Sequence, residues 1–223
     1  MAEPRPRRTR RFREAPLSRE AVLAAALRIA DEEGVDALSM RRLGQALDVE
    51  AMSLYKHVAG KEDVLDGIAD LVMAEVEPPP EDLPWREAVR RGAVSTHEAL
   101  LRHPWAAPVL ESRLTPGPRR LAYLEAMVAA FRRGGLGLRD VSRAFMALDA
   151  HVYGFTIQEL SFPFDLRDAP EEAAAMRELF MAHYPNLAAM ADLAMPGGDG
   201  VAIEFEFGLD LLLDGLERML ETR

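Results

Sequence analysis

Four residues suited to contacting phosphate lie close together between positions 55 and 61. Tyr55, Lys56 and His57 are consecutive, and Lys61 follows four residues later. A phenol hydroxyl and an ammonium group are natural donors to phosphate oxygens, and such contacts fix a protein's register on a DNA duplex. Lys61 also begins a predicted helix, where free backbone N–H groups and the helix dipole attract an anion. The spacing therefore predicts a phosphate-binding surface.

Residues just before this cluster have side chains that can reach DNA bases. Arg41 can contact a phosphate or the edge of a guanine. Ala51, Met52 and Ser53 open the short helix that carries the cluster, and they offer an apolar contact to a thymine methyl group and one hydroxyl hydrogen bond. We therefore expect modest direct reading of bases, with DNA shape contributing more.

Ordinary structural roles for the same side chains remain open alternatives. Tyr55 would then be half-buried packing, and His57 would cap the end of a helix. Lys56 and Lys61 would be solvated charges.

Helix signals place the cluster in a group of short helices. Ser18 is a predicted N-cap, Gly34 follows the first helix, and Ser39 caps the second. Asp48 and Val49 break the second helix just before the short third one. The predicted helices of this part cover 18–33, 39–47, 50–57 and 61–77. A tight break between the second and third helices is typical of a helix-turn-helix, whose last helix lies in the major groove.

The rest of the chain is also predicted to be helical. Three prolines at 78–80 cannot continue a helix and mark a boundary. Strand-like alternation is almost absent, so we predict an all-α fold: a flexible arginine-rich arm over 1–16, a helix-turn-helix head over 17–77 and a larger helical body over 78–223. The helices expected in the body cover 84–102, 105–112, 118–133, 138–160, 170–183 and 200–221.

Charge is distributed unevenly along the chain. The net charge is −10, yet residues 1–13 hold six arginines against one glutamate. A basic arm on an acidic body suits DNA binding, although a passive tail remains the alternative. The sequence has no cysteine and no long apolar run, so we expect a cytoplasmic protein that does not cross a membrane. We find no nucleophile–base pair, phosphate loop or metal-binding pattern, and therefore predict neither an enzyme nor a cofactor.

Three runs of residues resemble the signature of the TetR family of transcriptional regulators. They are Ala37 to Val49 (ALSMRRLGQALDV), Ser53 to Val58 (SLYKHV) and Lys61 to Leu65 (KEDVL). Asp48 departs from the family pattern, which usually has glycine in the turn, but Asp tolerates a left-handed backbone. Residues 103–105 and 151–154 extend the resemblance, more loosely, to the tetracycline-repressor type of C-terminal domain.

The resemblance implies a homodimer that binds a palindromic DNA operator and a small-molecule effector. Apolar stripes on the 138–160 and 200–221 helices are candidates for the dimer interface; the alternative is that both helices bury these stripes within one chain. Each candidate effector contact, taken singly, also suits an ordinary core residue. These candidates are Trp105, Leu110, Tyr123, Met127, Phe131, Leu148 and His151.

We therefore interpret the chain as a DNA-binding transcriptional regulator, a repressor that the effector releases from its operator. The alternatives are an architectural DNA-binding protein, or an activator, without an effector. An architectural protein leaves a body twice the size of the head unexplained.

Overall fold

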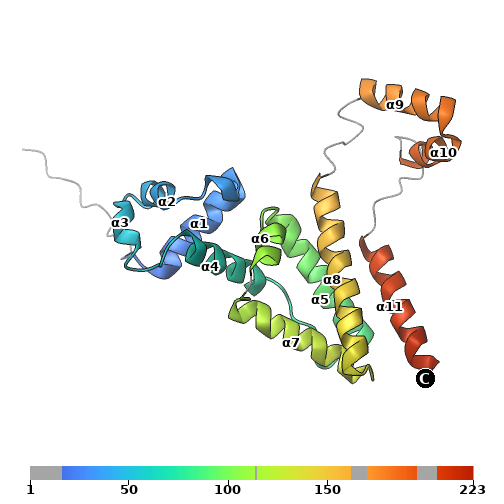
Figure 1. Cartoon of the computed structure of the whole chain (residues 1–223), viewed down its shortest axis with the longest axis horizontal. Coiled ribbons are helices and arrows are strands. Elements are labelled where there is room, and N and C mark those ends of the chain that lie inside the picture. The colour runs from blue at the N-terminus through green and yellow to red at the C-terminus, as the bar shows by residue number, and fades with distance from the viewer. Residues whose placement is uncertain (1–16, 114, 162–169, 195–204, 223) are drawn as a thin grey trace, which may run out of the picture. The chain divides into compact units, whose positions relative to one another are not determined.

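All regular elements in the described part of the chain are helices, so the predicted all-α class is confirmed (Figure 1). The computed structural model describes residues 17–113, 115–161, 170–194 and 205–222, and the predicted arm over 1–16 lies outside these ranges. The chain divides into two compact units, one ending at Val64 and one beginning at Leu65. None of the described helices combines the length and the apolar character needed to cross a membrane.

The first unit contains three α-helices and one turn of 3₁₀-helix. These are α1 (Arg19–Glu33), the 3₁₀ turn (Val35–Ala37), α2 (Met40–Ala46) and α3 (Ala51–Leu54), followed by the start of α4 (Lys61–Ala74). Both predicted serine caps are confirmed, because the Ser18 hydroxyl accepts from Ala21 N at 3.2 Å and the Ser39 hydroxyl from Arg42 N at 3.1 Å. Gly34, at φ +84°, follows α1 in the left-handed region that favours glycine.

A small apolar core holds these short helices together. Val22, Ala26 and Ile29 recur at helical spacing along α1 and are buried. Leu43 of α2 and Leu54 of α3 are buried as well. A helix as short as α3 has little stability of its own, so its position depends on this packing.

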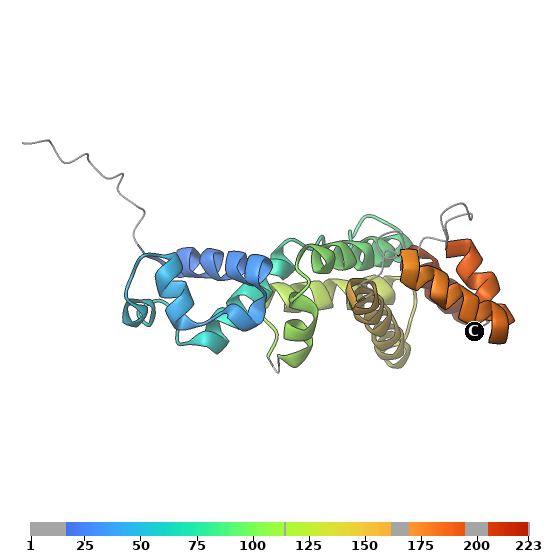
Figure 2. The same cartoon turned by 90° about the horizontal axis from the view of Figure 1, so that it is seen from above.

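The second unit is built from longer helices that pack side by side. They are the remainder of α4, then α5 (Trp85–Arg102), α6 (Ala106–Ser112), α7 (Pro118–Arg133), α8 (Leu138–Ser161), α9 (Pro170–His183), α10 (Pro185–Ala194) and α11 (Phe205–Glu221). Helix α5 packs against α7, α8 and α11, and α8 packs against α7 and α11 (Figures 1 and 2). Phe131 of α7 and Leu209 of α11 are fully buried.

Ion pairs add to the contact between α5 and α11. The Arg86 guanidinium lies 2.5 Å from Asp214 Oδ1 and 3.1 Å from Glu217 Oε2. Arg90, one helical turn later, binds Asp210 at 3.1 Å. Because carboxylates recur along one side of α11, this row fixes which side of the helix is turned toward α5.

The structure differs from the sequence prediction at three helices. Helix α3 ends at Leu54 and α4 ends at Ala74, both earlier than expected. Helix α10 (Pro185–Ala194) was not predicted, and it packs mainly against α9. Proline is favoured in the first turn of a helix, so Pro185 was a usable start signal.

Candidate functional site

The turn between α2 and α3 has the geometry of a helix-turn-helix. Asp48 adopts φ +53° and is the one non-glycine residue with positive φ among those described. Gly44 permits close approach, because a Cβ atom there would lie 2.8 Å from the Val49 carbonyl oxygen. The α2–α3 turn therefore depends on a residue without a side chain at position 44 and on a left-handed residue at position 48.

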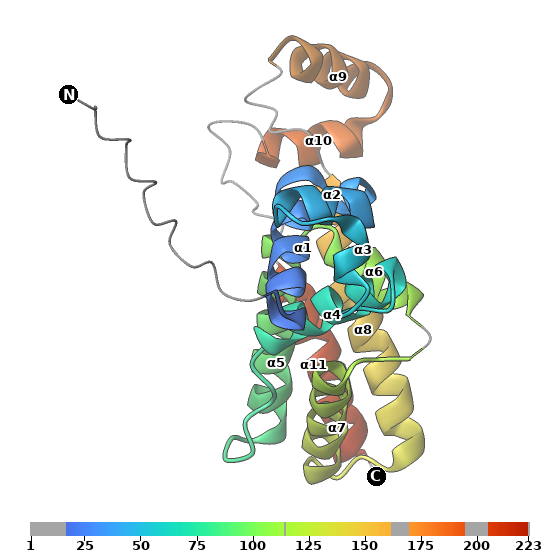
Figure 3. The same cartoon turned by 90° about the vertical axis from the view of Figure 1, so that its left-hand side faces the viewer.

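The predicted DNA-contacting residues lie on and beside α3 (Figure 3), and most of their side chains are exposed. Met52 is 76 % exposed and Tyr55 48 % exposed, although both are large side chains. Arg41, Lys56 and Lys61 are also exposed. We name the whole set the recognition surface: Arg41, Ala51, Met52, Ser53, Tyr55, Lys56, His57 and Lys61. Figure 3 shows α3, which carries its centre, beside α2. Ala51, Ser53 and His57 are half-buried within it.

One ion pair positions the chain between α3 and α4. The two nitrogens of the Arg19 guanidinium donate to the two carboxylate oxygens of Asp63 at 2.8 and 2.7 Å. Arg19 also donates to the His57 carbonyl oxygen at 3.4 Å, and Asp63 accepts from Ala59 N at 2.8 Å. The hydrogen bonds from Arg19 hold the pKa of Asp63 below its ordinary value. This bidentate pair fixes the segment that carries Lys61.

The sequence analysis missed Arg19 and one neighbour of Arg41. Arg19 lies only one residue after the N-cap of α1, far in sequence from the segment it fixes, and no periodic pattern signals such a pairing. Gln45 is exposed and lines an open depression together with Arg41, Asp48 and Ala51. An amide one helical turn after Arg41 was the available signal for Gln45.

The second unit contains a hollow that several helices line. We name it the body hollow, and it has about 350 Å³ of empty space, open solvent included. Helix α7 contributes Tyr123, and α8 contributes Asp149 and Tyr153. The other lining residues are Met73, Thr96, Arg120, Leu124, Met127, Phe145, Leu148 and Val152. The wall is thus mostly apolar and aromatic, with a few polar groups, as in typical small-molecule sites.

Burial perturbs the titratable groups of the body hollow. Burial and, to a smaller extent, the nearby Glu111 raise the pKa of Asp149 to about 6, while Arg120 opposes the rise. Burial also raises the pKa of Tyr123 and of Tyr153 above that of a free tyrosine. A carboxyl group on a largely apolar wall is a functional-site signal.

Three of the seven predicted effector contacts line the body hollow: Tyr123, Met127 and Leu148. Trp105 and Phe131 are buried outside it. The His151 ring stacks on Phe205, and His151 Nε2 lies 3.0 Å from the Phe205 carbonyl oxygen.

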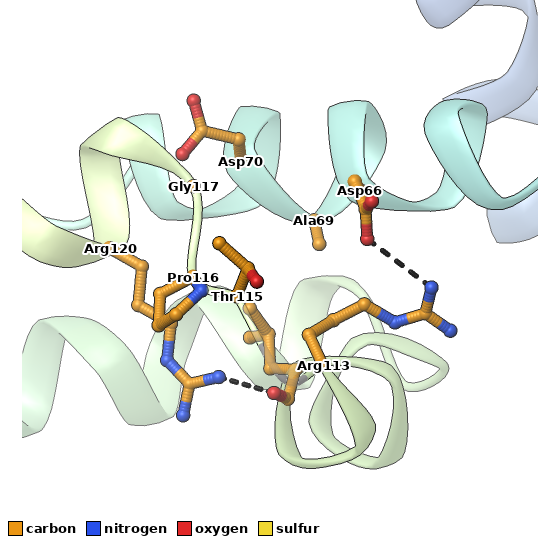
Figure 4. Close-up of a pocket in the computed structure, with 9 residues that line it drawn as sticks. Asp66, Ala69, Asp70, Arg113, Thr115, Pro116, Gly117 and Arg120 are labelled. Atoms are coloured by element: carbon orange, nitrogen blue, oxygen red, sulfur yellow. Dashed lines mark hydrogen bonds and ion pairs between the residues drawn. The ribbon is translucent and has the colours of Figure 1, made fainter. Parts of the chain in front are cut away.

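Leu110, the remaining predicted contact, lines a second hollow, which also includes Asp66, Asp70, Arg113 and Arg120 (Figure 4). We name it the turn hollow, because the segment between α6 and α7 forms one side of it. Arg113 donates to Asp66 of α4 at 3.2 Å, and Arg119 N donates to Asp70 of α4 at 2.8 Å. The turn hollow therefore lies where α4 is tied to the start of α7.

Arg120 lines both hollows. Its guanidinium donates to the Leu110 carbonyl oxygen and, at 2.9 Å, to Glu111 Oε1, both in α6. Arg120 also faces the body hollow near Asp149. One side chain thus connects the body hollow with the last turn of α6. The sequence analysis missed Arg120 and Asp149. Asp149 lies four residues after Phe145 and three before Val152, so a carboxylate on an apolar helix side was a detectable signal.

Family models match both parts of the chain. Residues 22–68 match the model of bacterial regulatory proteins of the tetR family, and residues 77–220 match the tetracyclin repressor-like C-terminal domain. The chain belongs to the TetR family. It is a DNA-binding transcriptional regulator and not an enzyme, as the sequence predicted.

Full-length relatives agree with this assignment to the TetR family. An HTH-type transcriptional regulator of Saccharopolyspora erythraea is 36 % identical over 205 residues, covering 90 % of this chain and 84 % of the relative. The HTH-type transcriptional repressor DrrR1 of Streptomyces coeruleorubidus is 34 % identical, covering 97 % of this chain and 83 % of the relative.

Two solved structures of TetR-like proteins contain ligands relevant to function. ActR of Streptomyces coelicolor, in complex with (S)-DNPA, has a TM-score of 0.73 and 32 % identity, covering 91 % of this chain and 98 % of ActR. BioQ with its double-stranded DNA operator has a TM-score of 0.65 and 27 % identity, covering 91 % of this chain and 99 % of BioQ. Members of this fold thus bind small molecules and operator DNA.

Proposed function

We propose that this TetR-family regulator is a homodimeric repressor that a small molecule, bound in the body hollow, releases from a palindromic operator. The observation that carries the proposal is the body hollow itself, a mostly apolar site with a few polar groups connected by Arg120 to α6. ActR in complex with (S)-DNPA and BioQ with operator DNA support the two binding steps.

Outward apolar side chains on two neighbouring helices support the homodimer. Phe207, Leu211 and Met219 recur at four- and eight-residue spacing on α11 and are 64 %, 55 % and 46 % exposed. On α8, Met146 is 67 % and Ile157 42 % exposed. Two such helices from each protomer would form a four-helix interface, and exposed apolar groups of this size commonly mark protein contacts.

The apolar stripes expected from the sequence include Met219 but none of the other four exposed residues. Their members Val141, Leu148, Val152, Phe205, Leu209 and Leu213 are buried within the body of one chain. The interface we propose therefore uses the opposite sides of the same two helices.

Helix α4 supports a mechanical route for release. It runs without a break from Lys61, on the recognition surface, to Ala74, and its Asp66 and Asp70 are bound by the segment around α6 and α7. A ligand that moves Arg120 would shift the last turn of α6 and, through Arg113, pull on α4. The two recognition surfaces of a dimer must fit the operator together, so a small displacement of α4 would weaken binding.

Selection of DNA from a random pool by the purified full-length chain tests the operator claim. We expect a palindrome whose half-sites are about 34–36 Å apart, one helical turn of DNA. The variant Lys61→Ala should recover the same sequence with lower affinity, whereas Arg28→Ala, which removes one charge from an exposed position on α1, serves as the matched control. Selection of no preferred sequence would overturn the repressor proposal in favour of an architectural DNA-binding protein.

A further inference from the structure

Asp149 is the acidic residue of the body hollow, and it has no partner there. In the part of the chain that the structure describes, no side chain forms an ion pair or hydrogen bond with its carboxylate. The residue is only partly buried, and the carboxylate lines the empty space of the hollow. A carboxylate that is partly removed from water without a compensating partner is unfavourable, and a bound cation would offset that cost.

Arg120 does not supply the missing positive charge. Its guanidinium is already bound to the Leu110 carbonyl oxygen and to Glu111, whose carboxylate balances its charge. Asp149, Arg120 and Glu111 together therefore leave one net negative charge at this wall. The other side chains around the hollow add no charge: Tyr123 of α7 and Tyr153 of α8 are neutral at physiological pH, and Met73 of α4 and Thr96 of α5 do not titrate.

Aromatic rings complete the wall around Asp149. Tyr123 of α7 and Phe145 and Tyr153 of α8 line the same hollow. Their π-faces attract cations and stack on flat apolar rings. The enclosed space is only about 10 Å³, room for about one water molecule. A ring system would therefore enter the hollow by displacing the side chains that line it.

We propose that the effector is a flat, apolar molecule with a protonated amine, and that the Asp149 carboxylate binds the ammonium group. This assignment rests on the proposed function, because it takes the body hollow as the effector site. The ammonium would complete an ion pair that the chain leaves unformed, and the rings would lie against the aromatic wall. Neutralisation of Asp149 would also remove its attraction for Arg120, the side chain that leads to α6.

Three probes that share one ring system test this assignment on the full-length protein. They are naphthylmethylamine, which is cationic, its neutral N-acetyl amide, and the anionic naphthylacetate. Probe affinity is measured by fluorescence titration or calorimetry at neutral pH. We expect the cation to bind about tenfold more tightly than the amide, which corresponds to about 1.4 kcal/mol, and the anion to bind weakest. Equal affinity for cation and amide, a preference for the anion, or binding of no probe would each overturn the assignment.

The variant Asp149→Asn should remove the preference for the cation and leave the affinity for the amide nearly unchanged. Glu125→Gln is the matched control, because it removes a carboxylate from an exposed position on α7 outside the hollow, and its cation preference should equal that of the wild type. If Asp149→Asn keeps the preference, the cation binds elsewhere and the assignment is wrong.

A pH titration of the wild type tests the same point without any variant. The cation affinity should fall as the pH drops below about 6, where the Asp149 carboxyl takes up a proton, while the amine probe stays charged and the amide affinity stays constant. Parallel curves for the two probes would contradict the assignment. Operator binding measured in the presence of each probe separates the cation site from the proposed function. If the protein prefers the cationic probe but no probe changes its affinity for DNA, effector-controlled release is refuted and Asp149 remains a cation site.

Discussion

Replacement of Asp149 by Asn should stabilise the folded protein at neutral pH. Burial raises the pKa of this carboxyl from 3.8 to about 6, so the native state favours the protonated form. That rise corresponds to about 3 kcal/mol as an upper limit, and the remaining exposure of the side chain reduces the expected effect to about 1–2 kcal/mol. Asn has nearly the same shape and carries no charge, so it avoids this cost.

The sign of the pH dependence follows from the direction of the pKa change. Above about pH 6 the wild-type carboxylate is charged in both the folded and the unfolded states, and the folded state bears the full cost. As the pH falls from about 6 to 3.8, the folded state takes up its proton first, so the wild type gains stability relative to Asp149→Asn. The advantage of the variant should therefore be greatest at neutral pH and vanish toward pH 3.8.

Urea unfolding of both proteins, followed by circular dichroism at equal protein concentration across this pH range, measures the difference. Glu125→Gln should change the free energy of unfolding by about 0.5 kcal/mol or less, since Glu125 is exposed. A variant that is less stable than the wild type at neutral pH, or a stability difference that does not change with pH, would refute the reasoning.

Four further substitutions test the head and the dimer. Gly44→Ala should lower the free energy of unfolding of the head by about 1–2 kcal/mol, because the new methyl group would clash with the Val49 carbonyl oxygen. A thermal melt identical to that of the wild type would contradict this. Tyr55→Phe and Lys61→Ala should each weaken operator binding. Only Lys61→Ala removes a positive charge, so it alone should reduce the salt dependence by about one unit of slope. Unchanged affinity of Tyr55→Phe, or an unchanged salt titration of Lys61→Ala, would remove that residue from the recognition surface. Leu211→Asp places a charge in the proposed apolar contact and should weaken dimerisation about 100-fold, which analytical sedimentation would measure. Unchanged dimer affinity would exclude α11 from the interface.

Local signals in the sequence were sufficient for much of the head. Ser18 and Ser39 cap their helices because a side-chain oxygen can satisfy free N–H groups, and that chemistry depends only on neighbouring residues. The left-handed turn at Asp48 is equally local. By contrast, α3 ends at Leu54 because the next residues form a tight turn, with His57 N and Val58 N both donating to the Leu54 carbonyl oxygen. Arg19 and Asp63 hold that turn from two other helices, so local propensity could not reveal it.

The body was predictable as a set of helices but not as a site. Periodicity identifies which residues of one helix share a side, and it gives no information about which other helix that side will meet. Tyr123 and Leu148 lie on different helices and line the same hollow, whereas Trp105 and Phe131 are packed outside it. Likewise, the apolar residues of α11 divide between a side buried against α5 and α8 and an outward side, and only the three-dimensional packing separates the two.

The placement of the two lysines has a consequence for the chemical reactivity of this protein. Lys56 and Lys61 are the only lysines among the 27 lysines and arginines of the chain, and both are exposed on the recognition surface. A reagent that acylates primary amines can therefore modify only these two side chains and the α-amino group. Acylation removes the positive charge of a lysine, so the same modification that marks the surface would also disable it. Bound DNA would shield both lysines, and the extent of acylation would report directly how much of the protein occupies its operator.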